Sequence, residues 1–169
     1  MMEITNEEIK EKIFDNIDND EYVDPFPDIS IKNTKILSNI TKVSSEYYLT
    51  DENIYYIVET CFDNKFFLYN EIIYSIDMSN KINRDFQFIL PLIKKYFDEV
   101  FGPRFATIYR IYQFGDDFLD QHSNCINAYG WKRISLYQKL SKKFIYKYAD
   151  KLDMNLIKNY NPYCKDLFD

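Results

Sequence analysis

Residues 131–161 read WKRISLYQKLSKKFIYKYADKLDMNLIKNYN, contain no glycine or proline, and repeat part of their own pattern. When this segment is aligned with itself at an offset of 23 residues, apolar and amide side chains coincide. The coinciding pairs are Trp131 with Met154, Ile134 with Ile157, Tyr137 with Tyr160, and Gln138 with Asn161. Self-similarity of this kind is typical of stacked helical repeats, in which each short helix buries apolar side chains against its neighbour.

A weaker copy of the pattern lies upstream at an offset of about 26 residues, with one residue of slippage at Tyr112 and Gln113. Its coinciding pairs are Phe118 with Phe144, Leu119 with Ile145, His122 with Tyr148, and Ile126 with Leu152. We therefore predict a C-terminal stack of short repeat helices over residues 112–169. Each copy is expected to bury a Trp or Met, an Ile and a Tyr.

The same segment resembles a short repeat of the form W-x-x-I-S-x-Y-Q-x-L-S-x-x-F-I. This repeat occurs in many copies in proteins of large DNA viruses and in some phage and bacterial proteins of AT-rich composition. The matching residues are Trp131, Ile134, Ser135, Tyr137, Gln138, Leu140, Ser141, Phe144 and Ile145. The resemblance covers residues 112–161 and implies helical packing without assigning an activity. Two positions depart from it, because Gly130 replaces an acidic residue and Met154 replaces a second Trp.

Length and composition favour one globular domain. The chain has 169 residues, of which 46% are hydrophobic and 18% aromatic, so it can build a single buried core. We predict a mainly α fold, with α+β as the alternative, because residues 64–78 and 104–114 can form a small β element. We divide the domain into an acidic N-terminal helix and arm (1–28), a globular core (29–111) and the repeats (112–169), which are continuous with the core.

Capping signals predict where two N-terminal helices begin. Thr5 is followed three residues later by Glu8, a capping box that starts a helix over about residues 6–18. Thr50 precedes two acidic residues, whose charge suits the positive end of a helix dipole, and predicts a helix over residues 51–62.

Two further segments give less uniform signals. Residues 29–48 fit a helix or a strand. An apolar stripe of helical spacing in residues 84–101 predicts a helix that Gly102 and Pro103 end. Pro91 either kinks that helix or begins its main part.

The net charge of −6 conceals an asymmetry. Residues 1–128 hold 12 basic and 23 acidic side chains, whereas residues 129–169 hold 9 and 4. Such a split indicates that the two ends face each other or that each meets a different partner. The candidate acidic binding surface consists of Glu7, Glu8, Glu11, Asp15, Asp18, Glu21, Tyr22 and Asp24. It can imitate a phosphate backbone, or it can be an ordinary solvated helix face.

A basic stripe is the second candidate binding surface. Its members are Lys139, Lys143, Lys147 and Lys151. If one helix carries them, they lie beside a buried apolar stripe, and their mutual repulsion is relieved by an anionic neighbour. That neighbour can be the acidic N-terminal arm, an acidic protein or a nucleic-acid backbone. The acidity of the whole chain disfavours nucleic acid, although it stays an alternative.

One cluster contains candidate metal ligands. Asp116, Asp117 and Asp120 form a D-D-x-x-D pattern that resembles the magnesium–diphosphate motif of prenyl and terpene synthases. Those enzymes have far longer chains and a second metal motif. His122 and Cys125 have a spacing that suits zinc, but a full site needs two more ligands. We therefore expect no metal or other cofactor, and interpret the cluster as an acidic helix start.

Several function classes are disfavoured by what the sequence lacks. Three glycines are too few for the phosphate-binding loops of common nucleotide enzymes. Three cysteines without C-x-x-C spacing favour a reducing compartment. The longest apolar runs are too short to span a membrane. We therefore expect a cytoplasmic protein, in the host cell if it is viral or phage-encoded.

Our hypothesis is a small intracellular protein–protein interaction module, not an enzyme, with a protein partner that meets its charged surfaces. The resemblance suggests a virus- or phage-encoded inhibitor of a host factor. Two alternatives stay open. One is a metal-dependent phosphate-handling enzyme at the D-D-x-x-D cluster, and the other is a nucleic-acid binder that uses the basic stripe.

Overall fold

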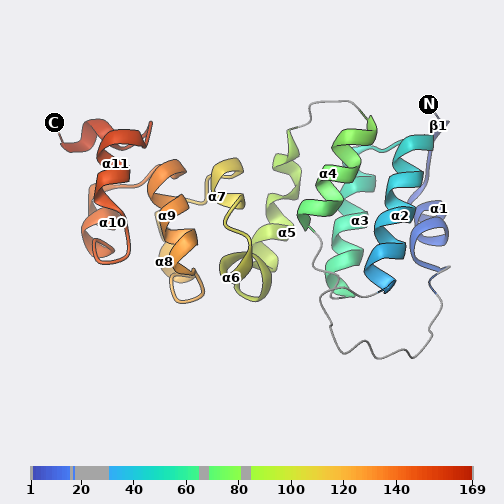
Figure 1. Cartoon of the computed structure of the whole chain (residues 1–169), viewed down its shortest axis with the longest axis horizontal. Coiled ribbons are helices and arrows are strands. Elements are labelled where there is room, and N and C mark those ends of the chain that lie inside the picture. Colours follow the sequence, from blue (N-terminus) through green and yellow to red (C-terminus); the bar gives the residue numbers. More distant parts are fainter. Residues whose placement is uncertain (1, 16, 18–30, 65–68, 81–84, 169) are drawn as a thin grey trace. The chain divides into compact units, whose positions relative to one another are not determined.

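The computed structural model describes residues 2–15, 17, 31–64, 69–80 and 85–168 (Figure 1). The chain divides into two compact units, Met1–Ile89 and Leu90–Asp169. Helices dominate both units, which confirms the predicted mainly α fold. The boundary between the units falls inside the predicted globular core, residues 29–111. That the core and the repeats form one continuous domain stays a prediction.

The N-terminal unit opens with strand β1 (Met2–Glu3), helix α1 (Asn6–Lys10) and the π-helical turn η1 (Glu11–Asp15). The predicted capping box is confirmed. The backbone N–H of Glu8 donates to Thr5 Oγ1 over 3.2 Å, and the backbone N–H of Thr5 donates to the Glu8 carboxylate over 2.9 Å.

Helix α2 (Ile31–Glu46) shows that the ambiguous segment 29–48 is helical over its described part up to Glu46, whereas its last two residues form a strand. Strand β2 (Tyr47–Tyr48) pairs with β1 in parallel. Helix α3 (Asp51–Asp63) begins at Thr50 as predicted, and α4 (Tyr69–Asn80) and the 3₁₀ turn η3 (Phe86–Ile89) complete the unit. Helix α2 packs against α4, and α1 packs against α3. The fully buried aliphatic side chains of the unit include Ile9, Ile13, Ile36, Ile40, Ile54, Ile57, Val58, Ile72 and Ile76.

The alternative of a small β element in residues 64–78 and 104–114 is wrong for the residues that the structure describes. Residues 69–80 form helix α4, and residues 108–111 form helix α7. Tyr69, Ile72 and Ile76 are buried at helical spacing along one face of α4. A short apolar run does not distinguish a strand from a buried helix, so the sequence alone did not show that these residues share one face of a helix.

The C-terminal unit begins with α5 (Leu90–Lys95), the π-helical turn η4 (Phe97–Phe101) and α6 (Gly102–Arg104). Pro91 is the second residue of α5, where its missing N–H leaves no helical bond unmade. The helical path continues to Arg104, two residues beyond the predicted stop at Gly102. A Cβ on Gly102 would lie 2.6 Å from Cys125 Sγ, so a glycine is needed for this close approach.

The rest of the C-terminal unit alternates between two sets of short helices. The first set is α7 (Ile108–Ile111), α9 (Ala128–Tyr137) and α11 (Met154–Tyr160), which pack in that order. Each is followed by a helix of the second set, α8 (Asp116–Gln121), α10 (Lys142–Lys147) and the 3₁₀ turn η5 (Lys165–Phe168) (Figure 1). Across the described parts of both units, no helix combines the length and the apolar character needed to cross a membrane.

Candidate functional site

Two buried amide side chains join the helices of the first set. Gln138 ends α9, and its Nε2 donates to the carbonyl oxygens of Tyr109 and Tyr112 over 2.6 Å each. Asn161 ends α11, and its Nδ2 donates to the carbonyl oxygens of Ser135 and Gln138 over 2.9 Å each. Each amide therefore binds the same two positions of the preceding helix, its C-terminal capping residue and the residue three places before it.

The acceptor ends of these amides are also used. Gln138 Oε1 accepts from the backbone N–H of Phe114 over 2.9 Å, and Asn161 Oδ1 accepts from Tyr163 and Cys164. Both side chains are fully buried, so these bonds satisfy polar groups that water does not reach. We call this arrangement of Gln138 and Asn161 the amide ladder. It supplies a structural reason why these two residues coincide at an offset of 23.

Most aligned apolar positions of the three copies are buried. The aligned positions with less than 9% of their surface exposed are Leu119, Ile126, Trp131, Ile134, Phe144, Ile145, Tyr148, Leu152 and Ile157. The expected burial of the repeat tyrosines is wrong, because Tyr137 is half-buried and Tyr160 is 66% exposed. Each directly precedes an inward amide, and neighbouring helical residues point about 100° apart.

The basic stripe does not lie on one helix. Helix α10 covers only Lys142–Lys147, because the Ser141 hydroxyl accepts from the backbone N–H of Phe144 and begins the helix there. Lys139 therefore precedes the helix and Lys151 follows it, so one helix does not carry all four lysines. Lys147 Nζ lies 2.5 Å from Asp120 Oδ1, and Lys151 Nζ lies 5.4 Å from the centre of the Trp131 ring. Part of the stripe is thus balanced within its own unit.

The three carboxylates of the D-D-x-x-D pattern lie on α8, but two of them bond to α10 and its capping residues. Asp116 accepts from the backbone N–H of Ser141 over 3.2 Å. Asp120 accepts from Lys147 and from the Tyr148 hydroxyl over 2.5 Å each, and these bonds hold the pKa of Asp120 below its usual range. Among the described residues, no group of three His, Cys, Asp or Glu side chains can hold a metal ion.

His122 and Cys125 meet a carboxylate that the sequence analysis missed. Asp98 Oδ1 lies 2.5 Å from His122 Nδ1 and 3.2 Å from Cys125 Sγ. Burial raises the pKa of Asp98, but the hydrogen bonds from His122 and Cys125 outweigh it and leave the pKa below its usual value. Burial, followed by the contact with Asp98, raises the pKa of Cys125 to about 12. The thiol therefore stays protonated near neutral pH and is a poor nucleophile.

A sequence signal for Asp98 exists. It follows buried Phe97 as Asp120 follows buried Leu119, and each aspartate bonds to side chains about one repeat further along the chain. A similar aspartate contact therefore also occurs upstream of residue 112.

The acidic N-terminal surface is described only in part. Glu7, Glu8, Glu11 and Asp15 are exposed on α1 and η1. Hydrogen bonds from Thr5 lower the pKa of Glu8, which serves as part of the capping box. The other predicted members, Asp18, Glu21, Tyr22 and Asp24, lie outside the described residues.

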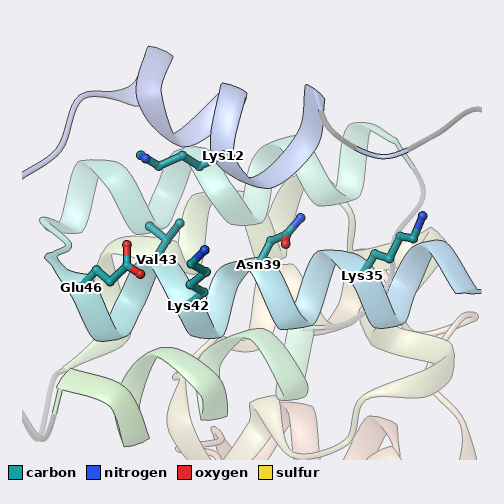
Figure 2. Close-up of a pocket in the computed structure, with 6 residues that line it drawn as sticks. All are labelled: Lys12, Lys35, Asn39, Lys42, Val43 and Glu46. Carbon is teal, nitrogen blue, oxygen red and sulfur yellow. The ribbon is translucent and has the colours of Figure 1, made fainter.

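A basic groove of about 480 Å³ lies between η1 and α2. Figure 2 shows Lys12 from η1 opposite a row of side chains along α2. The row consists of Lys35, Asn39, Lys42, Val43 and Glu46. Lys12 also lies 5.5 Å from the centre of the Tyr47 ring. The unit that carries the acidic surface therefore also has a local basic face.

An arginine held by two tyrosines lies on the outer side of α9. Tyr129, Arg133 and Tyr137 are four residues apart. The Nε and Nη2 atoms of Arg133 donate to the Tyr129 hydroxyl, and Nη1 donates to the Tyr137 hydroxyl over 3.4 Å. The guanidinium carbon lies 5.0 and 5.9 Å from the centres of the two rings. These contacts fix the position of the guanidinium group at the surface.

This arginine helps to line a hollow of about 400 Å³ between α7 and α9, with Thr107, Arg110 and Ile111. Ile111 is 48% exposed and Tyr129 is 53% exposed. We call these four residues and Tyr129 the α7–α9 face. Sequence reasoning missed it because residues 104–114 fitted a strand as well as a helix, although the Y-x-x-x-R-x-x-x-Y spacing was readable.

Comparisons with protein-family models, with curated proteins and with solved structures found no match for this chain. The amide ladder and the aspartate contacts join neighbouring helices, whereas the α7–α9 face turns polar and apolar groups toward solvent. This face is the best candidate for a functional site within the described part of the chain.

Proposed function

We propose that the protein is an interaction module that binds another protein through the α7–α9 face. The supporting observation is the exposure of Ile111 and Tyr129 beside a guanidinium group that two tyrosines hold in place. Tyrosine and arginine are enriched among the residues that contribute most to binding at protein interfaces. An exposed isoleucine beside them adds apolar surface that a partner can cover.

The amide ladder supports this proposal because it restrains the helices that carry the face. Gln138 joins the end of α9 to the end of α7, and all three of its hydrogen bonds are buried. A surface on restrained helices loses little conformational entropy on binding, so more of the contact energy contributes to affinity.

Charge supports an acidic partner for this face. Residues 90–169 hold 13 basic and 9 acidic side chains, whereas residues 1–89 hold 8 and 18. Electrostatic complementarity speeds the encounter with an oppositely charged surface and disfavours other partners. The acidic surface and the basic stripe stay predictions of further regions that contact a protein partner.

The two alternative functions receive less support. Asp116 and Asp120 bond to the capping residues of α10, which weakens the proposal of a metal-dependent enzyme. Lys147 is paired with Asp120, which weakens the proposal of a nucleic-acid site on the basic stripe. The narrower prediction of a virus- or phage-encoded inhibitor of a host factor, located in the cytoplasm, rests on the sequence resemblance and stays a prediction.

Affinity capture from a host-cell extract tests the proposal when it is combined with surface variants. The double variant Ile111→Ser/Tyr129→Ala removes the apolar part of the α7–α9 face, and we expect it to lose a protein that the wild type retains. Tyr146→Ala is the matched control, because Tyr146 is a 67% exposed tyrosine on α10, outside this face. Equal capture by all three proteins would assign binding to another surface, and no specific capture by any would contradict the proposed function.

A further inference from the structure

We infer that the hollow between α7 and α9 is a carboxylate-binding site for an acidic peptide segment, in which an Asp or Glu stands beside an aliphatic or aromatic residue. The inference rests on the proposed function, because it names the part of a protein partner that the α7–α9 face recognises. Arg133 and Arg110 are the proposed carboxylate contacts, and Ile111 is the proposed apolar contact.

Arg133 is positioned to bind an anion. A guanidinium group has five N–H donors in a planar fork, and the recorded bonds to Tyr129 and Tyr137 use three of them. The described residues provide no recorded acceptor for the remaining two. The tyrosines thus fix the group while leaving donors for a ligand, and two parallel N–H groups of arginine match the two oxygens of a carboxylate.

Arg110 adds a second cation from α7 to the same hollow. Within the described part of the chain, its side chain has no recorded hydrogen bond or ion pair. Two guanidinium groups that line one hollow repel each other, and a carboxylate between them replaces this repulsion with two attractions. The charge of the site therefore calls for an anionic ligand.

The apolar lining favours a peptide over a free anion or a nucleic acid. The hollow of about 400 Å³ has more room than one carboxylate needs, and Ile111 borders it with 48% of its surface exposed. A neighbouring aliphatic or aromatic side chain of a peptide can cover that isoleucine. Single-stranded nucleic acids are held by free aromatic rings on which bases stack. Among the described residues, no aromatic side chain lines this hollow, and Arg133 already lies against the Tyr129 ring.

The test is an NMR titration of the full chain, labelled with ¹⁵N and ¹³C. Three probes are compared: the capped peptide Ser-Leu-Glu-Tyr-Asp-Leu, the same peptide with Gln and Asn in place of Glu and Asp, and a short oligothymidine. We expect the acidic peptide to shift the Nε–Hε signals of Arg110 and Arg133, and the neutral peptide to leave them in place. Arg133→Gln should weaken binding of the acidic peptide about tenfold, because a bond between charged groups is lost.

Lys132→Gln is the matched control, since it removes the same charge from an exposed neighbour on α9 and should change the affinity less than about twofold. An unchanged backbone spectrum shows that each variant is folded. The inference is overturned if millimolar acidic peptide moves neither arginine signal, or if the neutral peptide binds equally well. Tighter binding of oligothymidine would also overturn it and would make the hollow a nucleic-acid site.

The same variants separate this inference from the proposed function. If Arg133→Gln still captures the partner that Ile111→Ser/Tyr129→Ala loses, the face binds protein but the carboxylate site is wrong. If the acidic peptide binds but the wild type captures no protein, the hollow binds carboxylates and the proposed function fails.

Discussion

Helix α9 carries two polar regions that differ in how completely their hydrogen bonds are used. At its C-terminal end, the buried Gln138 side chain donates two hydrogen bonds to backbone carbonyls and accepts one from a backbone N–H. All three backbone groups lie in residues 109–114. On its outer side, Arg133 is fixed by Tyr129 and Tyr137 and has donors to spare. The buried hydrogen bonds of Gln138 join the helices, whereas Arg133 at the surface is held in place and still has N–H groups that can bind a ligand.

Removal of the Gln138 amide should produce the largest loss of stability. Gln138→Ala leaves two carbonyl groups and one N–H group buried without their partner, and we expect the free energy of unfolding to fall by about 3 kcal/mol. Chemical denaturation followed by the fluorescence of Trp131, the single tryptophan, measures this loss in the C-terminal unit.

Gln113→Ala is the control for this change. Gln113 also bonds to two backbone groups at the C-terminal end of α9, the Tyr137 carbonyl and the Lys139 N–H, but it is exposed. Because water can replace those bonds, we expect a loss of less than about 1 kcal/mol. Equal losses in the two variants would contradict the distinction between the buried and the exposed network.

A second, smaller loss of stability is expected where Gly102 lies close to Cys125 and Phe97. Gly102→Ala places a Cβ 2.6 Å from Cys125 Sγ and 3.0 Å from the Phe97 ring, and the strain should lower the free energy of unfolding by about 2 kcal/mol. The double variant Gly102→Ala/Cys125→Ala removes the sulfur and should recover part of this loss. A Gly102→Ala protein as stable as the wild type would contradict this expectation, because Cys125 and Phe97 would then move aside without loss of stability.

The Asp98 contact should make stability depend on acid. The pKa of Asp98 is lower in the folded protein than its ordinary value, so its contribution is present above about pH 4 and is lost as the pH falls through the folded pKa. Between about pH 5 and pH 2, Asp98→Asn should lose less unfolding free energy than the wild type. Acid unfolding followed by Trp131 fluorescence measures the difference, with exposed Asp117→Asn as control. Parallel curves for wild type and Asp98→Asn would exclude this contribution.

The features that could be predicted from the sequence are those that local chemistry decides. The capping box at Thr5 joins residues three positions apart, and Thr50 stands directly before two acidic residues, so local sequence revealed both helix starts. Gln138 and Asn161 were aligned before their shared contacts were seen, because both have an amide where a helix ends.

The features that could not be predicted depend on which helices pack together. The hollow requires α7 to lie against α9, and the sequence left α7 open between helix and strand. The four lysines of the basic stripe do not share one helix for a local reason. The Ser141 side chain caps a new helix between Lys139 and Lys143. Asp98 was missed because its partners lie 24 and 27 residues away, outside the segment searched for repeats.

The substitution Arg133→Gln should have the smallest effect on stability and a large effect on binding. The acidic peptide Ser-Leu-Glu-Tyr-Asp-Leu is titrated into wild type and variant, and the free energy of unfolding is measured on the same samples. We predict about tenfold weaker binding, with a change in unfolding free energy within about 0.5 kcal/mol. Equal binding by both proteins, or a loss of binding that follows a loss of folding, would contradict the proposed carboxylate-binding role of Arg133.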